Sequence, residues 1–94
     1  MNKKFLLLLI VLSSNSATVF ADGRLLASQC FQCHGPNGHS KGGIDSIAGE
    51  SESEIYNELK EMKQKNKIEI MHLQAKSYTD AEIREIAQYL STLR

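Results

Sequence analysis

The chain has 94 residues with 11 Lys or Arg and 11 Asp or Glu, so its formal net charge at pH 7 is zero. This balance argues against a nucleic-acid-binding protein, because nucleic acid is recognised by a basic surface. The sequence shows no internal repeat, no low-complexity tract and no alternating strand pattern. Its apolar residues recur at helical spacing, which predicts one small all-α domain.

The N-terminal segment has the parts of a secretory signal peptide. Lys3 and Lys4 precede an unbroken apolar run over 5–12, and residues 19–21 offer small side chains at the −3 and −1 positions of a cleavage site. We predict a signal peptide over 1–21 and a periplasmic mature protein. Spanning a bilayer takes about 20 apolar residues, so we expect no membrane insertion after cleavage, with an uncleaved anchor as the alternative.

The remaining segment, 22–94, would form the mature domain. It has nine basic and 11 acidic residues, a net charge of −2. A chain of this size buries only about 60% of its unfolded surface, so its own core is marginal. A large apolar cofactor would supply the missing interior, which favours the two cysteines as cofactor anchors over a disulfide.

A first helix is predicted over about 23–33, and it delivers the motif Cys30-Phe31-Gln32-Cys33-His34 at its end. Cys-x-x-Cys-His is the attachment signal of c-type haem. This spacing places both sulfurs on one face of a helix, where they can bond to the two vinyl groups of one porphyrin. We therefore predict Cys30 and Cys33 as covalent haem anchors and His34 as the proximal iron ligand.

Two other interpretations of the cysteine pair are a redox disulfide and half of a zinc site. A thioredoxin-like disulfide needs a preceding strand and a βαβ pattern, and neither is visible. A zinc site needs two further ligands, but the chain has no third cysteine, and His39 and His72 lack zinc-finger spacing. We expect His39 to lie on an exposed turn.

Breaker and turn residues over 35–38 end the first helix, and a loop follows as far as Gly49. Such loops are uncommon in so small a domain unless a non-peptide group organises them, and a haem edge would do so.

The capping-box pattern of Ser51 and Glu54 predicts the start of a second helix. Its apolar stripe consists of Ile55, Leu59 and Met62.

Four lysines lie within the segment 60–67, which we expect to fray into a loop: Lys60, Lys63, Lys65 and Lys67. They can be interpreted as a patch that steers an acidic redox partner. They can also be interpreted as a solvated helix end, where cations complement the helix dipole. The glutamates among them favour the second interpretation.

The third helix has the clearest pattern. Thr79 and Glu82 form a second capping box, and Tyr78 with Ile83 suits a hydrophobic staple. The apolar stripe that follows consists of Ile83, Ile86, Leu90 and Leu93.

In this order, the motifs resemble those of small class I, mono-haem bacterial cytochromes c across essentially the whole mature chain. The resemblance rests on the cysteine motif, the segment 46–49, a methionine-bearing loop, and a C-terminal helix with an aromatic at Tyr89. It implies an all-α fold of three to four short helices wrapped around one covalently attached haem c. It also implies that the terminal helices cross, with Gly23 or Leu26 meeting Tyr89 and Leu90.

The resemblance also bears on the axial ligands. The family often has a proline whose carbonyl accepts the proximal His Nδ1 hydrogen, but here the only proline, Pro36, directly follows the motif. We therefore expect another backbone carbonyl, near Gly43, to be the acceptor. The family carries its distal methionine in the loop before the last helix, where Met71 lies. The alternatives are Met62, which suits the core, and His72, whose imidazole would lower the potential.

Three functions are compatible with these features. The first is a soluble one-electron carrier with His/Met-ligated iron that exchanges electrons with donor and acceptor proteins and has no catalytic residues of its own. The second is the haem subunit of a hetero-oligomeric oxidoreductase, since the segment 46–49 resembles the cytochrome subunit of flavin-containing sulfide dehydrogenases. The third is a haem-based ligand-binding protein or peroxidase, which needs an open sixth position on iron.

Overall fold

The computed structural model describes residues 22–94, so the predicted signal peptide over 1–21 lies outside the described residues. Within them all regular structure is helical, which confirms the all-α prediction. The elements are α2 (Gly23–Ala27), η1 (Ser28–Cys30), α3 (Phe31–His34), η2 (Pro36–Gly38), α4 (Glu52–Gln64), α5 (Ile70–Lys76) and α6 (Asp80–Leu90). None of the helices in this part of the chain combines the length and apolar character that a bilayer crossing needs.

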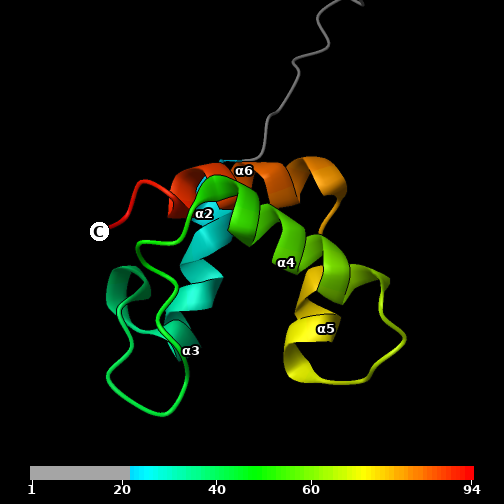
Figure 1. The fold of residues 1–94 in the computed structure, drawn as a ribbon, viewed down its shortest axis with the longest axis horizontal. Coiled ribbons are helices and arrows are strands. Elements are labelled where there is room, and N and C mark those ends of the chain that lie inside the picture. Colours follow the sequence, from blue (N-terminus) through cyan, green and yellow to red (C-terminus); the bar gives the residue numbers. More distant parts are fainter. Residues whose placement is uncertain (1–21) are drawn as a thin grey trace, which may run out of the picture.

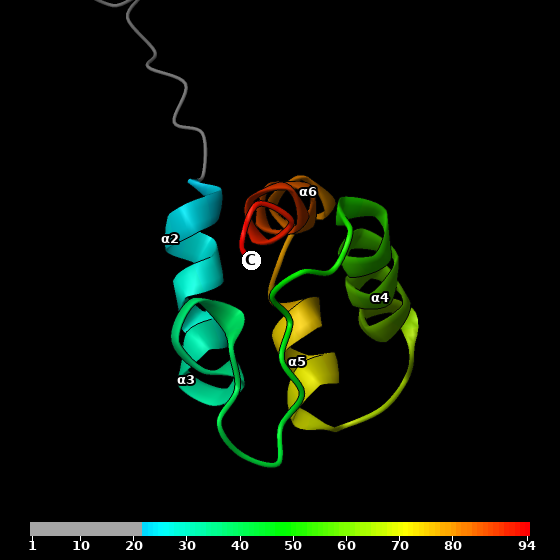
Figure 2. The same cartoon turned by 60° about the vertical axis from the view of Figure 1, so that its left-hand side comes forward.

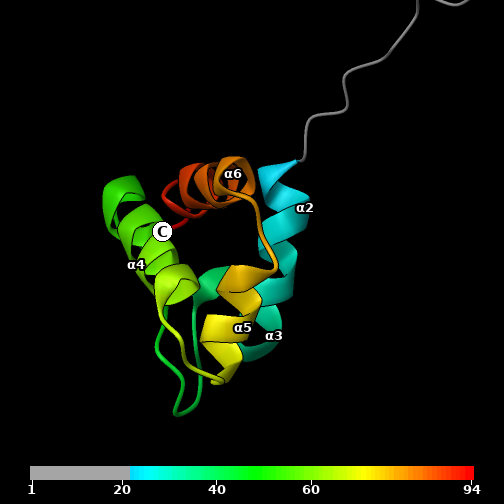
Figure 3. The same ribbon diagram turned by 90° about the vertical axis from the view of Figure 1, so that its right-hand side faces the viewer.

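The helices form an open cluster around α6. Helices α2 and α4 both pack against α6, and α5 packs against α4 (Figure 1). Two further views agree that α5 lies beneath α6, between α4 on one side and the α2–α3 segment on the other (Figures 2 and 3). The buried apolar core is drawn mainly from α4 and α6: Ala27, Ile55, Leu59, Ala75, Tyr78, Ile83, Ile86, Ala87 and Leu90.

The crossing of α2 and α6 depends on the lack of a side chain at Gly23. A Cβ atom built there would lie 2.4 Å from the Glu85 carbonyl oxygen and 3.3 Å from the Tyr89 Cβ. The two backbones can therefore touch only because residue 23 is glycine. This confirms the predicted meeting of Gly23 with Tyr89.

We expect Gly23→Ala to destabilise the protein by about 1–3 kcal/mol, the usual cost of adding a methyl group where the packing leaves no room for it. The added methyl group would have to push away the backbone of α6, which cannot move like a flexible side chain. Urea denaturation of the haem-loaded protein measures the change. Gly42→Ala is the matched control, since nothing lies within 4 Å of a Cβ at Gly42; equal midpoints for the two variants would contradict the packing argument.

The N-terminal caps explain where the two longest helices begin. At α6 the Glu82 N–H donates to Thr79 Oγ1 at 3.1 Å, and the Thr79 N–H donates to Glu82 Oε1 at 2.9 Å, so the predicted capping box is complete. At α4 the Glu54 N–H donates to Ser51 Oγ at 3.2 Å, which is the Ser51 half of the predicted box.

Helix α4 continues further than its lysine-rich sequence predicts. Lys60 and Lys63 are helical rather than frayed, because both reach Asp80 at the start of α6, with Nζ–O distances of 2.7 and 3.0 Å. Hydrogen bonds from these two ammonium groups lower the pKa of the Asp80 carboxyl. Lys65 pairs with Glu61 at 3.0 Å. Three of the four lysines are thus engaged within the domain, which favours the helix-end interpretation over a docking patch.

The helix boundaries in the structure differ from the prediction in two further places. The first helix is not continuous over 23–33 but is divided into α2, the 3₁₀ turn η1 and α3. The segment predicted as a methionine-bearing loop contains α5. The residue before α5, Glu69, makes no side-chain capping bond. The helix instead depends on tertiary contacts, with Ala75 fully buried and Lys76 Nζ donating to the carbonyl oxygens of Met62 and Lys65.

Candidate functional site

The cysteine motif lies at the edge of a cavity between the helices. Cys30 is the last residue of η1 and is half-buried, whereas Cys33 in α3 is exposed; both thiols are free. The cavity measures about 220 Å³. Its lining consists of Cys30, His34, Asp45, Ser46, Ile47, Glu50, Ile55, Glu58, Leu59, Met62, Met71 and Leu90. The chain thus brings a thiol, an imidazole and two thioethers to one largely apolar space.

The imidazole of His34 is held in a defined orientation. Its Nδ1 lies 2.6 Å from the carbonyl oxygen of Asp45, and because a carbonyl can only accept, Nδ1–H is the donor. This leaves the lone pair of Nε2 free to bind a metal, the arrangement found for metal-ligating histidines. The acceptor is a backbone carbonyl, as expected, and lies two residues beyond Gly43.

Met62 and Met71, the two methionines among the described residues, both line the cavity. Met71 belongs to α5. Met62 projects from α4 near the end of the stripe that includes the buried Ile55 and Leu59. The cavity therefore brings together Cys30, His34, Met71 and the alternative Met62.

The two other histidines lie elsewhere. His39 is exposed, as expected. His72 is only 8% exposed and lines a different depression, with Lys65 and Lys67 among its neighbours. Its Nδ1 lies 3.5 Å from Glu69 Oε2 and has no hydrogen-bond partner. Met71 lines the cavity at the cysteine motif, whereas the next residue of α5, His72, does not.

The properties of the cysteines disfavour the redox and zinc interpretations. Burial raises the pKa of the Cys30 thiol, whereas a redox-active or zinc-binding cysteine needs a stabilised thiolate. Across residues 22–94, no three His, Cys, Asp or Glu side chains are grouped so as to hold a metal ion. A c-type haem fits the residues present, because it requires two thiols, one oriented imidazole and an apolar enclosure.

Sequence reasoning missed three acidic residues at this site: Asp45, Glu50 and Glu58. Burial, followed by repulsion from Glu58 and Glu54, raises the pKa of Glu50. No motif in the sequence marks Glu50, and a backbone acceptor such as the Asp45 carbonyl has no side-chain signature. The return of the loop over 39–50 to the cysteine motif determines the positions of Asp45 and Glu50, whereas Glu58 is contributed by α4.

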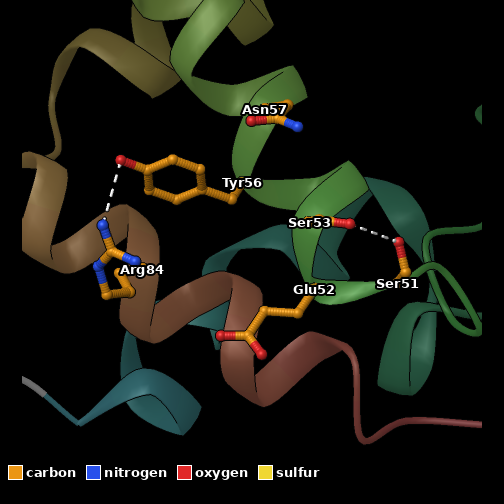
Figure 4. A pocket seen from close by; sticks show the side chains of 6 residues that line it. All are labelled: Ser51, Glu52, Ser53, Tyr56, Asn57 and Arg84. Carbon is orange, nitrogen blue, oxygen red and sulfur yellow. Dashed lines mark hydrogen bonds between the residues drawn. The ribbon is translucent and has the colours of Figure 1, made fainter.

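A larger depression of about 450 Å³ lies between the start of α4 and α6 (Figure 4). It is lined by Ser51, Glu52, Ser53, Tyr56, Asn57 and Arg84. The Arg84 guanidinium lies 4.8 Å from the centre of the Tyr56 ring and donates to its hydroxyl at 3.4 Å. None of these side chains supplies a thiol, an imidazole or a thioether. The cavity at the cysteine motif is therefore the better cofactor site.

Comparisons with known proteins found a matching family model and related proteins. The family model described as cytochrome c matches residues 20–94. The chain is 36% identical to a "Cytochrome c-553" of Helicobacter pylori over 95 residues, which cover 98% of this chain and 99% of that protein. It is 38% identical to a "Cytochrome subunit of sulfide dehydrogenase" of Chlorobaculum tepidum over 72 residues, 76% of this chain and 66% of that protein.

Proposed function

This chain belongs to the cytochrome c family, and from that premise we propose that it is an exported one-electron carrier whose iron is held by His34 and Met71. Membership of the family implies a covalently bound haem c and a role in electron transfer rather than in enzymatic catalysis. The observation that carries the proposed ligand pair is that both side chains line the same cavity. Met62 lines it too, and Met71 is preferred because it lies in the segment directly before the last helix, where the family carries its distal methionine.

Bound haem c supplies an iron atom that gains and loses one electron. The side chains of Cys30 and Cys33 would anchor the group as thioethers, next to the imidazole that they position. The Asp45 carbonyl fixes the ring of His34 and increases the basicity of its Nε2. The Met71 thioether would favour the ferrous state, raise the potential and close the sixth position.

The proposal is tested by a redox titration of the protein produced with haem-maturation machinery. We expect reversible one-electron behaviour and, in the oxidised protein, the weak absorption band of sulfur bonded to iron. An absent band, together with rapid carbon monoxide binding to the reduced protein at neutral pH, would instead indicate the open site of a ligand-binding protein or peroxidase.

A second candidate is the haem subunit of an oxidoreductase complex. The relation to the Chlorobaculum tepidum protein and the segment 46–49 favour it. Gel filtration of a native membrane-free extract distinguishes the two: elution in a larger complex supports a subunit, and elution at the mass of a single chain supports a free carrier.

Export is supported by the sequence pattern of residues 1–21. N-terminal sequencing of the periplasmic protein tests it, and we expect the mature chain to begin at Asp22. A chain that retains residues 1–21 in the membrane fraction would favour the uncleaved anchor.

A further inference from the structure

Three side chains near the cavity form a closed triangle of hydrogen bonds. Gln74 Nε2 donates to Gln29 Oε1 at 3.0 Å and to the Tyr78 hydroxyl oxygen at 2.7 Å. The Tyr78 hydroxyl donates to the same Gln29 Oε1 at 3.1 Å. The Tyr78 residue is only 7% exposed, and the two hydrogen bonds of its hydroxyl are partly buried.

The triangle joins two elements, η1 and α5, that each contribute a residue to the cavity lining. Gln29 lies in η1 immediately before Cys30, whereas Gln74 lies in α5, three residues after Met71. Residues three apart in a helix share one side of it, so fixing Gln74 also limits the movement of Met71. Tyr78 lies two residues after the end of α5 and is part of the buried core.

Helix α5 needs such an attachment. It has only seven residues and no side-chain N-cap, and helices this short are unstable on their own. Ile70 is 80% exposed and Leu73 is 51% exposed, so part of its apolar surface is not packed. Lys76 fastens α5 to the end of α4, and the triangle is the polar connection on the opposite side, toward the cysteine motif.

We propose that Gln29, Gln74 and Tyr78 are positioning residues that hold α5 against the cysteine-motif segment and thereby keep Met71 facing His34. The part of this proposal that concerns iron rests on the ligation proposed above. Without the Tyr78 hydroxyl, Gln29 and Gln74 each lose a hydrogen-bond partner, and α5 would separate from η1 more often. With haem bound, each separation would move the Met71 thioether away from the iron and leave room there for small ligands.

Tyr78→Phe tests the proposal because it removes the hydroxyl and keeps the buried ring. In the haem-loaded variant we expect backbone amides over 70–76 to exchange hydrogen about fivefold faster, the effect of losing roughly one net hydrogen bond. We expect carbon monoxide to bind the reduced variant faster by a similar factor. Tyr56→Phe is the matched control, since its hydroxyl bonds to Arg84 in the separate depression, and it should change neither rate.

Hydrogen exchange over 70–76 tests the positioning role, and the sulfur-to-iron band of the wild-type protein tests the ligation by Met71, so the two proposals can fail separately. Exchange over 70–76 that is no faster in Tyr78→Phe than in Tyr56→Phe overturns the positioning role. A wild-type protein without the sulfur-to-iron band overturns Met71 ligation, and the exchange comparison still decides whether the triangle holds α5. Faster exchange with unchanged carbon monoxide binding, in a protein that has the band, overturns the link between the triangle and the sixth position.

Discussion

Replacing Cys30 and Cys33 together with alanine is expected to abolish covalent haem attachment and, with it, the stable folded domain. These are the only two cysteines in the chain, so no other thiol can form the thioethers. The cavity of about 220 Å³ would then lack its occupant. Burial of apolar surface against the haem would stabilise the fold by about 25 cal/mol per Å², and a small domain has only about 5–15 kcal/mol of stability in total, so we expect loss of the haem to unfold it.

The loss is measured by haem absorbance of the purified protein and by its helical circular dichroism through a urea titration. Ser28→Ala is a suitable control, because it changes an exposed residue of the same turn and keeps both thiols. A double-alanine variant that retains its haem on denaturing gels, or unfolds at the wild-type urea concentration, would contradict the interpretation of the cysteines as anchors of the core.

Replacing Met71 with alanine is expected to remove the sulfur-to-iron absorption band and to lower the reduction potential. A thioether ligand stabilises ferrous iron, so its loss favours the ferric state. Axial ligands set haem potentials over a range of about 0.8 V, and we expect a fall on the order of 100 mV. Spectroscopic redox titration measures both changes in one sample.

Met62→Ala is the matched control, because it removes a thioether from another wall of the same cavity. We expect it to cost about 2–5 kcal/mol of stability, the usual effect of truncating a packed methionine, and to leave the band in place. If the band survives Met71→Ala and disappears in Met62→Ala, the ligand is Met62. A band lost in both variants would point to disruption of the cavity rather than to either ligand.

The features predicted correctly from sequence are those with a local signature. The Thr79 cap and the apolar stripe of Ile83, Ile86 and Leu90 are each contained within a few turns of one helix. The capping bonds join residues three apart in the sequence, so they form wherever this helix forms. The meeting of Gly23 with Tyr89 came from the family resemblance, and the close backbone contact explains why a glycine is needed there.

The features that sequence reasoning missed depend on distant contacts. Helix α5 lacks a capping residue and is held by Lys76 and Gln74, whose partners lie in other elements. The last turn of α4 is retained because Lys60 and Lys63 reach Asp80. No pattern confined to one segment could have predicted these bonds.

Peptide mass analysis tests the central claim most directly, namely that haem linked through two thioethers completes the interior of this domain. Trypsin cleaves after Arg24 and Lys41, so residues 25–41 form one peptide that contains the whole cysteine motif. We predict that this peptide from the exported protein carries one haem and that neither sulfur reacts with an alkylating reagent. A folded, colourless protein whose two cysteines are alkylated, or bonded to each other, would contradict the claim.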